Sequence, residues 1–244
     1  MRLFFIIFLI LTFIGPISIL IWGRIDFMAD YRDANRDSIH IAPDPATVKE
    51  ALIQIYAARA FNWRGIFATH TWIATKEKNA EHYTVYQIIG WRLLRNLSAL
   101  SITEDLPDRR WFNQNPHLVY ELRGEQAETL IQKIANAAKS YPYPDRYVTW
   151  PGPNSNTFPA YVLRQVPELH ATLPSNALGK DFLPNGAVFT VAPSHTGYQF
   201  SLFGLFGMML AKEEGIEINV LGLVYGFSPK MRIIKLPGFG DIKI

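Results

Sequence analysis

The N-terminal part of the chain is an uninterrupted apolar segment. Residues 3–22 contain no charged side chain and consist mainly of Phe, Ile and Leu. In a helix, which rises about 1.5 Å per residue, a segment of this length covers the roughly 30 Å hydrocarbon core of a bilayer. It has no polar stripe, and no small-x-small cleavage site follows it before Asp26. We therefore expect an uncleaved transmembrane anchor over residues 1–23 rather than a signal peptide or a buried core helix.

Residues 24–45 are predicted to link this anchor to the rest of the chain. The segment is polar and ends in Ala-Pro-Asp-Pro, where the two prolines favour extended backbone and exclude a helix. Arginines lie on both sides of the apolar segment, so the positive-inside rule does not orient it. A short N-terminal tail with one arginine, Arg2, is typical of a signal anchor, which favours export of the downstream domain. We expect a single-pass protein of the cell inner membrane with its soluble domain on the periplasmic side.

Short segments rich in β-branched and aromatic residues come after the linker, with polar or glycine-containing breaks between them, and this pattern predicts strands. The predicted strands cover residues 51–59, 67–75, 83–89 and His117–Arg123. The stretch between the second and third is polar, which predicts an antiparallel hairpin with a longer loop. Towards the C-terminus, residues 217–225 and 231–236 are further strand candidates.

Helical periodicity marks three other segments. In Glu125–Lys139 the apolar residues recur at helical spacing, with acidic residues early and a lysine at the end, as the helix dipole favours. A second helix is predicted from about Asn156 to residue 166, because Pro167 stops it. The apolar residues 198–212 predict a third helix, which is too short to span a bilayer and is expected to be buried. Short strands together with helices indicate an α+β fold.

Composition and charge narrow the functional classes. With 49% hydrophobic and 18% charged residues the chain is too apolar to be disordered, and its length after the linker suits a single globular domain over residues 46–244. The net charge is only +3 and the basic residues are scattered, so nucleic acid is not an expected partner. The absence of cysteine excludes disulfides, thiolate metal sites, a cysteine nucleophile and a lipidated N-terminal cysteine. No two histidines have the spacing of a helical zinc pair, and we expect neither a metal nor a cofactor.

The most unusual local sequence is Trp-Pro-Gly-Pro-Asn-Ser-Asn-Thr-Phe-Pro, which begins at Trp150 and runs directly into the second predicted helix. Its last proline fits best in the first helical turn, which places Ser155 just ahead of the helix N-terminus. There the helix dipole and free backbone N–H groups would stabilise an oxyanion or an anionic ligand. The alternative is that Asn154, Ser155 and Asn156 only cap the helix and form the turn.

A serine hydroxyl needs a base before it acts as a nucleophile, and His70 is the best candidate. It lies in Thr-His-Thr-Trp, where strand alternation places His70 and Trp72 on one face, although such a histidine is also a common packing residue. His82 and Gln87, on or next to the following strand, are candidates to orient His70, and His195 is a second candidate base. Residues expected to bind a ligand are Asn154, Asn156, Trp72 and Trp150.

The order of these motifs resembles that of the circularly permuted papain-like proteins, in which a strand histidine precedes a helix-borne cysteine that often follows an asparagine. Ser155 stands where that cysteine would be, so the resemblance implies a permuted papain-like antiparallel sheet with helices packed on it but excludes a thiol mechanism. The chain also resembles an uncharacterised bacterial family, domain of unknown function 3750. The resemblance rests on Pro43-Asp44-Pro45, Tyr56-Ala57-Ala58-Arg59, His70-Thr71-Trp72-Ile73, Gly152-Pro153-Asn154-Ser155-Asn156-Thr157-Phe158, Gly179-Lys180-Asp181 and Lys235-Leu236-Pro237-Gly238.

Two hypotheses about function arise for this expected cell-envelope protein. The first is a serine-dependent amide or ester hydrolase or acyltransferase, with Ser155 as nucleophile and His70 as general base. The second is a non-catalytic binding or assembly module of the envelope that keeps a papain-like groove lined by tryptophans. In a variant of the second, residues 198–210 contact lipid or a partner. The expected partners are the bilayer, through the N-terminal helix, and a glycan, peptide or lipid of the envelope.

Overall fold

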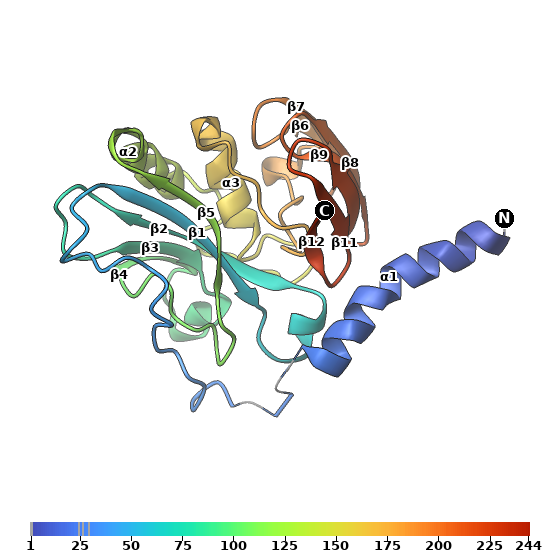
Figure 1. Ribbon diagram of the computed structural model, residues 1–244, viewed down its shortest axis with the longest axis horizontal. Coiled ribbons are helices and arrows are strands. Elements are labelled where there is room, and N and C mark those ends of the chain that lie inside the picture. The colour runs from blue at the N-terminus through green and yellow to red at the C-terminus, as the bar shows by residue number, and fades with distance from the viewer. Residues whose placement is uncertain (1, 24, 26, 29) are drawn as a thin grey trace.

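Two antiparallel sheets organise the protein, as Figure 1 shows for this computed structural model, which describes residues 2–23, 25, 27–28 and 30–244. The α+β class with antiparallel strands is therefore confirmed. The first sheet has five strands, which in spatial order are β4 (Leu100–Glu104), β3 (Thr84–Ile88), β2 (Thr69–Lys76), β1 (Leu52–Arg59) and β5 (His117–Arg123). Each strand expected in this region is present, and the predicted hairpin is β2 and β3, paired with Ile73 opposite Tyr86. Only β4 was not foreseen.

The second sheet has seven strands, each paired with its neighbours in the chain. They are β6 (Phe189–Val191), β7 (Gly197–Leu202), β8 (Phe206–Ala211), β9 (Gly215–Val220), β10 (Leu223–Ser228), β11 (Ile233–Leu236) and β12 (Gly240–Lys243). Helix α3 (Thr157–Gln165) lies between the two sheets, and helix α2 (Glu125–Lys139) lies beside it against the first sheet (Figure 1). The bounds of α2 are those predicted from its periodicity.

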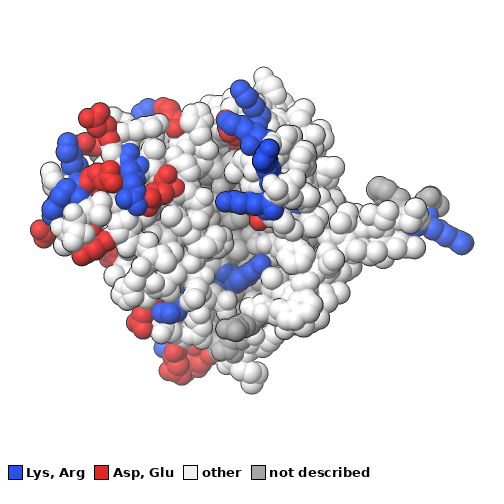
Figure 2. Space-filling model, viewed as in Figure 1, with Lys and Arg blue, Asp and Glu red and all other residues white. Residues whose placement is uncertain are grey.

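Helix α1 (Arg2–Trp22) is the predicted apolar helix, and it is long and apolar enough to cross a membrane. It docks on the second sheet: Phe8 packs on Tyr225 with 5.6 Å between ring centroids, and Thr12 Oγ1 lies 2.6 Å from the Tyr225 hydroxyl. Gly15 permits this approach, because a Cβ there would lie 2.0 Å from the carbonyl oxygen of Pro237. The N-terminal end of α1 projects past the sheet (Figure 1). Charged side chains gather mainly over the other end of the molecule, and the side towards α1 is mostly uncharged (Figure 2).

The predicted linker is held against the first sheet over much of its length. The Asp108 carboxylate accepts hydrogen bonds from the backbone N–H groups of Ile41 at 2.7 Å and Ala42 at 3.0 Å. Arg24 and Asp26, at the start of the predicted linker, lie outside the described residues. The described part therefore wraps around the sheet rather than hanging free of it.

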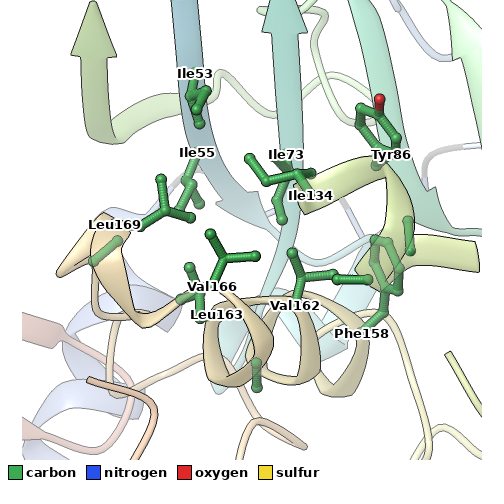
Figure 3. Packing of buried hydrophobic residues seen from close by; sticks show 14 of the residues in the cluster. Ile53, Ile55, Ile73, Tyr86, Ile134, Phe158, Val162, Leu163, Val166 and Leu169 are labelled. Atoms are coloured by element: carbon green, nitrogen blue, oxygen red, sulfur yellow. The ribbon is translucent and has the colours of Figure 1, made fainter. Parts of the chain in front are cut away.

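The main hydrophobic core lies between the first sheet and its helices (Figure 3). Ile53, Ile55 and Ile73 point from β1 and β2 towards Ile134 of α2 and Leu163 of α3, and all five are buried. The alternate residues of these strands face the other side of the sheet, as a period of two requires. Truncating one such buried aliphatic side chain to alanine typically costs about 2–5 kcal/mol, so this core fixes α3 on the sheet.

The predicted helix over residues 198–212 is wrong, because this segment forms the β7–β8 hairpin. Gln199 and Ser201 are buried while Tyr198 and Phe200 are exposed, so the segment alternates with a period of two. Apolar residues dominate it so strongly that the two polar positions were overlooked. The turn between the strands contains Gly204 with φ of 74°, a conformation that glycine adopts without strain.

The strand predicted over residues 217–225 is also divided, whereas the one over residues 231–236 is present as β11. Leu221 and Gly222 both have positive φ, and they form the tight turn between β9 and β10. Residues 217–225 therefore belong to a hairpin and not to one strand. Three of the four residues that flank the turn are apolar, so the pattern of hydrophobic positions gives no sign of a break between two strands.

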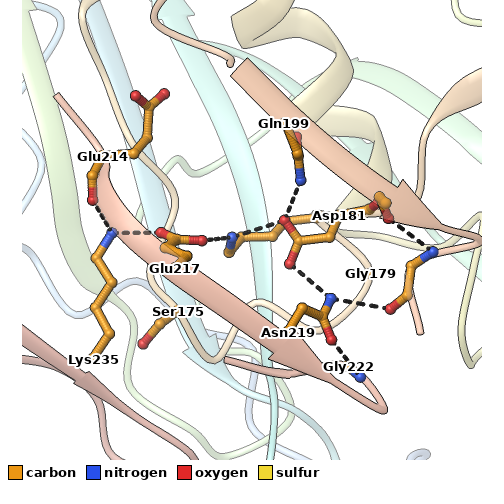
Figure 4. A network of polar contacts seen from close by, with 12 residues as sticks. Ser175, Gly179, Asp181, Gln199, Glu214, Glu217, Asn219, Gly222 and Lys235 are labelled. Atoms are coloured by element: carbon orange, nitrogen blue, oxygen red, sulfur yellow. Dashed lines mark hydrogen bonds and ion pairs between the residues drawn. The ribbon is translucent and has the colours of Figure 1, made fainter. Parts of the chain in front are cut away.

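The inward face of the second sheet carries a buried network of charges (Figure 4). The Glu217 carboxylate accepts hydrogen bonds from Lys180 and Lys235, each at 2.5 Å. Asp181 accepts from the same Lys180 at 3.0 Å and from the Gln199 amide at 2.6 Å. Burial alone would raise the pKa of Glu217, but the two lysines overcome that effect and lower it to about 2. The carboxylate of Glu217 is therefore ionised. The charge network lies between the second sheet and the rest of the protein.

Candidate functional site

A cleft with a volume of about 560 Å³ opens beside the N-terminal end of α3. It is lined by loops of the first sheet, by the segment that precedes α3 and by the β9–β10 turn. Its lining includes the aromatic residues Phe61, Trp63, Phe67, Trp91, Trp111, Tyr147 and Trp150, and we call it the aromatic cleft. Small-molecule sites are typically of about 300–1,000 Å³ and mostly apolar, so the cleft has the size and lining of a ligand site.

Ser155 lies at the wall of the aromatic cleft, two residues before α3 begins. It is buried, and its side chain lies beside that of Tyr147. Burial raises the pKa of Tyr147, while nearby Arg64 and the contact with Ser155 lower it in part. Tyr147 therefore stays a neutral phenol at neutral pH. Neither Arg64 nor Tyr147 is predicted as a site residue, because Arg64 lies in a short 3-10 helix (Asn62–Ile66) and Tyr147 in a loop, and neither segment has a distinguishing sequence pattern.

Asn154 forms the turn that places Ser155. Its side-chain oxygen accepts hydrogen bonds from the backbone N–H groups of Asn156 at 2.9 Å and Thr157 at 3.3 Å, and its amide nitrogen donates to two carbonyl oxygens. The backbone N–H groups of Asn156 and Thr157, which the sequence predicts to be free for an oxyanion, therefore already donate to Asn154. The N–H of Ser155 has no acceptor among the described residues. Asn154 lines the cleft, so its role in ligand binding stays a prediction.

Asn156 joins the start of α3 to the strand that carries His70. Its side-chain oxygen accepts from the Thr71 backbone N–H at 3.0 Å and from the Thr71 hydroxyl at 2.9 Å, and its amide donates to the Thr69 carbonyl at 2.8 Å. These contacts lie on both sides of His70. They bring Ser155 and His70 to the wall of the same cleft. Asn156 also lines the cleft, and a ligand contact from it stays a prediction.

His70 is buried and tightly held. Its ring stacks on Trp111 with 3.5 Å between centroids and 8° between planes, and its Nε2 lies 3.2 Å from Gln87 Oε1. Because that oxygen only accepts hydrogen bonds, the proton belongs on Nε2 and the lone pair on Nδ1. Burial lowers the pKa of His70 to about 3, although the Gln87 contact raises it in part. The ring is therefore neutral at neutral pH.

His70 and Ser155 face the same cleft without touching each other. No hydrogen bond joins them in the described part of the chain, and His70 Nδ1 has no hydrogen-bond partner there. The arrangement leaves the free nitrogen of an oriented, neutral imidazole and a serine hydroxyl around one apolar space. Serine-dependent acyl transfer needs a hydroxyl and an imidazole, and the wall of the cleft carries both groups.

Three other predicted site residues lie in different surroundings. His82 is exposed and lies 3.3 Å from Glu104, and it does not line the cleft; the orienting contact to the histidine on β2 comes from the neighbouring glutamine. Trp72 is buried on the opposite side of the sheet from the helices, where its indole donates to the Pro107 carbonyl at 2.8 Å. Trp150 is half exposed at the cleft. Only some of the predicted site residues therefore lie together at the aromatic cleft.

The remaining candidates give no metal site and no second base. Among the residues that the structure describes, no group of three or more His, Asp or Glu side chains is placed to hold a metal ion. His195 Nε2 lies 2.9 Å from the Arg164 carbonyl, away from the aromatic cleft. The cleft is therefore the place where the predicted chemistry is concentrated.

Comparisons with known proteins bear on the cleft-forming part of the chain. No curated protein and no solved structure matches. The family described as "Protein of unknown function (DUF3750)" matches residues 50–182, which include the first sheet, α2, α3 and both Ser155 and His70. The strands of the second sheet follow that region. Since the match covers more than half of the chain, the protein belongs to the DUF3750 family.

Proposed function

We propose that this protein is a membrane-anchored, serine-dependent hydrolase or acyltransferase that acts on an amphiphilic ester or amide of the cell envelope. One observation carries the proposal: Ser155, ahead of α3, and His70, oriented by Gln87, line the same aromatic cleft. A histidine on one strand, its orienting amide on the next and a nucleophile before a helix form the arrangement expected of a permuted papain-like scaffold. Ser155 occupies the cysteine position in that scaffold.

The chemistry would proceed through an acyl-serine. The Ser155 oxygen attacks the substrate carbonyl while the hydroxyl proton passes to Nδ1 of His70. The backbone N–H of Ser155 donates a hydrogen bond to the resulting oxyanion, and the positive end of the α3 dipole stabilises its charge. The proton then passes to the leaving alcohol or amine as the carbonyl bond to it breaks. Water, or an acceptor alcohol in a transferase, attacks the acyl-serine and restores the hydroxyl.

The lining of the cleft and the position of α1 support an amphiphilic substrate. The cleft walls are aromatic and aliphatic, and the charged residue among them is Arg64. Such a site suits an apolar chain with an anionic headgroup. We place α1 in the inner membrane and the domain on its periplasmic side, so that the cleft has access to envelope lipids.

A second candidate, a non-catalytic binding protein, is favoured by the state of His70. A ring that is stacked on Trp111 and has a pKa of about 3 is a weak base at neutral pH. The side chain of Ser155 also lies beside Tyr147, a neutral phenol that does not activate it. On this hypothesis the cleft holds the same amphiphile without cleaving it.

The test is covalent labelling of the full chain in membranes with an alkyl fluorophosphonate, which modifies activated serines. We expect the wild type to be labelled and Ser155→Ala and His70→Ala to lose the label. Ser140→Ala and His82→Ala are matched controls, because both residues lie away from the cleft, and they should keep it.

The two candidates give different results in this assay. An unlabelled wild type that binds a fluorescent fatty acid as tightly as Ser155→Ala does would reject the hydrolase and leave the binding protein. Equal labelling of the wild type and Ser155→Ala would show that the nucleophile lies elsewhere.

A further inference from the structure

The seven-stranded sheet presents apolar side chains outward and buries a mixture of charged, polar and apolar side chains inward, whereas a sheet in a soluble protein usually turns its apolar face to the core. The strand register lines up one row of cross-strand neighbours through all seven strands. That row is Val191, Tyr198, Leu210, Ile216, Phe227, Ile234 and Ile242. Each of these side chains is at least partly exposed, and none is charged.

Two further rows extend this surface on the same side of the sheet. The second is Phe189, Phe200, Met208, Ile218 and Tyr225, and the third is Leu202, Phe206, Val220 and Leu223. We call the three rows together the apolar face. Soluble monomers rarely expose contiguous apolar patches larger than a few hundred Å² (about 300–600), and a larger one marks a surface that contacts a partner or a membrane.

The inward side chains explain why the sheet has this orientation. Between the apolar rows lie Gln199, Glu217 and Lys235, which are buried in the charge network. Lys180 and Asp181 lie outside the strands, so turning the sheet over would leave them buried against apolar side chains without Glu217 and Gln199, at a large cost. The apolar face is therefore a fixed feature of the fold.

Helix α1 identifies what covers this face. Its contacts with the second sheet are made on the apolar face itself, because Tyr225, which meets Phe8 and Thr12, belongs to the second row. If α1 crosses a bilayer, the part of the sheet that packs against α1 must lie at or in the same bilayer. The strands β7, β8 and β9 continue the same face away from Tyr225 without any cover from α1.

We propose that the apolar face of the seven-stranded sheet is immersed in the bilayer that α1 enters, so that the protein rests on the membrane through a β-sheet as well as a helix. Lying flat, the sheet immerses its outward side chains to a depth of about 5–10 Å. Its backbone groups are paired between neighbouring strands, and the unpaired edges at β6 and β12 stay near the headgroups. The inference rests on the anchor role proposed for α1 but not on the chemistry of Ser155.

The immersed face also reaches the aromatic cleft. Leu223 belongs to the third row and lines the cleft, as does its neighbour Leu221 in the β9–β10 turn. An acyl chain could therefore pass from the bilayer to the cleft along apolar side chains. If the protein is the hydrolase or acyltransferase proposed above, its substrate class is therefore a membrane lipid.

The absence of cysteine makes a direct test simple, because single cysteines can be labelled without removing others. Full-length Met208→Cys and Ile218→Cys carry an environment-sensitive fluorophore on the apolar face, two strands and one strand away from Tyr225. Ile10→Cys reports on α1, and Ile102→Cys is the matched control, an exposed isoleucine on a strand of the other sheet. Each is reconstituted into phosphatidylethanolamine–phosphatidylglycerol vesicles with or without spin-labelled acyl chains, after its unfolding midpoint is shown to match the wild type.

We expect a several-fold loss of emission at positions 10, 208 and 218 in spin-labelled vesicles, and almost none at 102. Quenching at 10 together with unquenched emission at 208 and 218 would overturn the proposal and leave the anchor standing. Unquenched emission at all four positions would overturn the anchor as well. Disulfide formation between two unlabelled Met208→Cys chains under an added oxidant, together with unquenched emission of the labelled protein, would assign the face to a second copy of the chain instead.

Discussion

Replacing Glu217 by glutamine tests the buried charge network. The carboxylate lies between Lys180 and Lys235 at 2.5 Å from each, and Glu217→Gln keeps its size but removes the charge. Breaking a buried ion pair in this way typically costs about 3–5 kcal/mol, since the remaining charges stay buried without compensation. An independent route gives a similar figure: a pKa lowered from 4.5 to about 2 is worth about 3 kcal/mol.

The sign of the pH dependence is set by that pKa. A carboxylate whose pKa is lower in the folded than in the unfolded protein stabilises the fold fully above the unfolded value of 4.5. This contribution is lost as the pH falls from about 4.5 towards about 2. Glu217→Gln should lack this part of the pH dependence.

The assay is denaturant unfolding of the full chain in detergent, followed by tryptophan fluorescence at several pH values. Glu213→Gln is the matched control, because Glu213 pairs with the exposed Lys230 in the same sheet and its loss should cost less than about 1 kcal/mol. If Glu217→Gln unfolds within about 0.5 kcal/mol of the wild type, or keeps the acid-dependent loss, the network does not stabilise the sheet as argued.

Two further predictions concern the cleft. Asn156→Ala removes a buried amide that forms hydrogen bonds with Thr71 and Thr69, so we expect it to lower the free energy of unfolding by about 2–4 kcal/mol. Denaturant unfolding measures this effect, with Asn136→Ala on the surface as the control. Equal unfolding midpoints for the two variants would mean that the amide does not fix α3 on β2. Burial lowers the pKa of His70 from 6.5 to about 3, so wild-type stability should fall by about 5 kcal/mol as the pH drops through that window, and His70→Phe should lack this fall. A parallel pH dependence in both proteins would show that the histidine is not buried as a neutral ring.

The site residues show where prediction from sequence ends. The serine ahead of α3 and the strand histidine were identified because each depends on a few neighbouring residues. Their relation depends on the hydrogen bonds of Asn156 with Thr69 and Thr71, which join segments about 85 residues apart and have no local signature. In the same way, nothing near Trp111 in the sequence indicates that its ring stacks on the histidine and lies beside Trp72.

The sequence by itself determined the elements whose signal is local. The apolar helix α1, the bounds of α2 and the strand His117–Arg123 follow from length and periodicity, which report on neighbours within one or two turns. Only the tertiary structure decided that residues 198–212 form a hairpin and that its apolar side faces outward. The reason is that period-two alternation does not say which side is covered. In this sheet the buried side carries Glu217 and Gln199, which bond Lys180 and Asp181, and the apolar face is turned outward, towards the surroundings of α1.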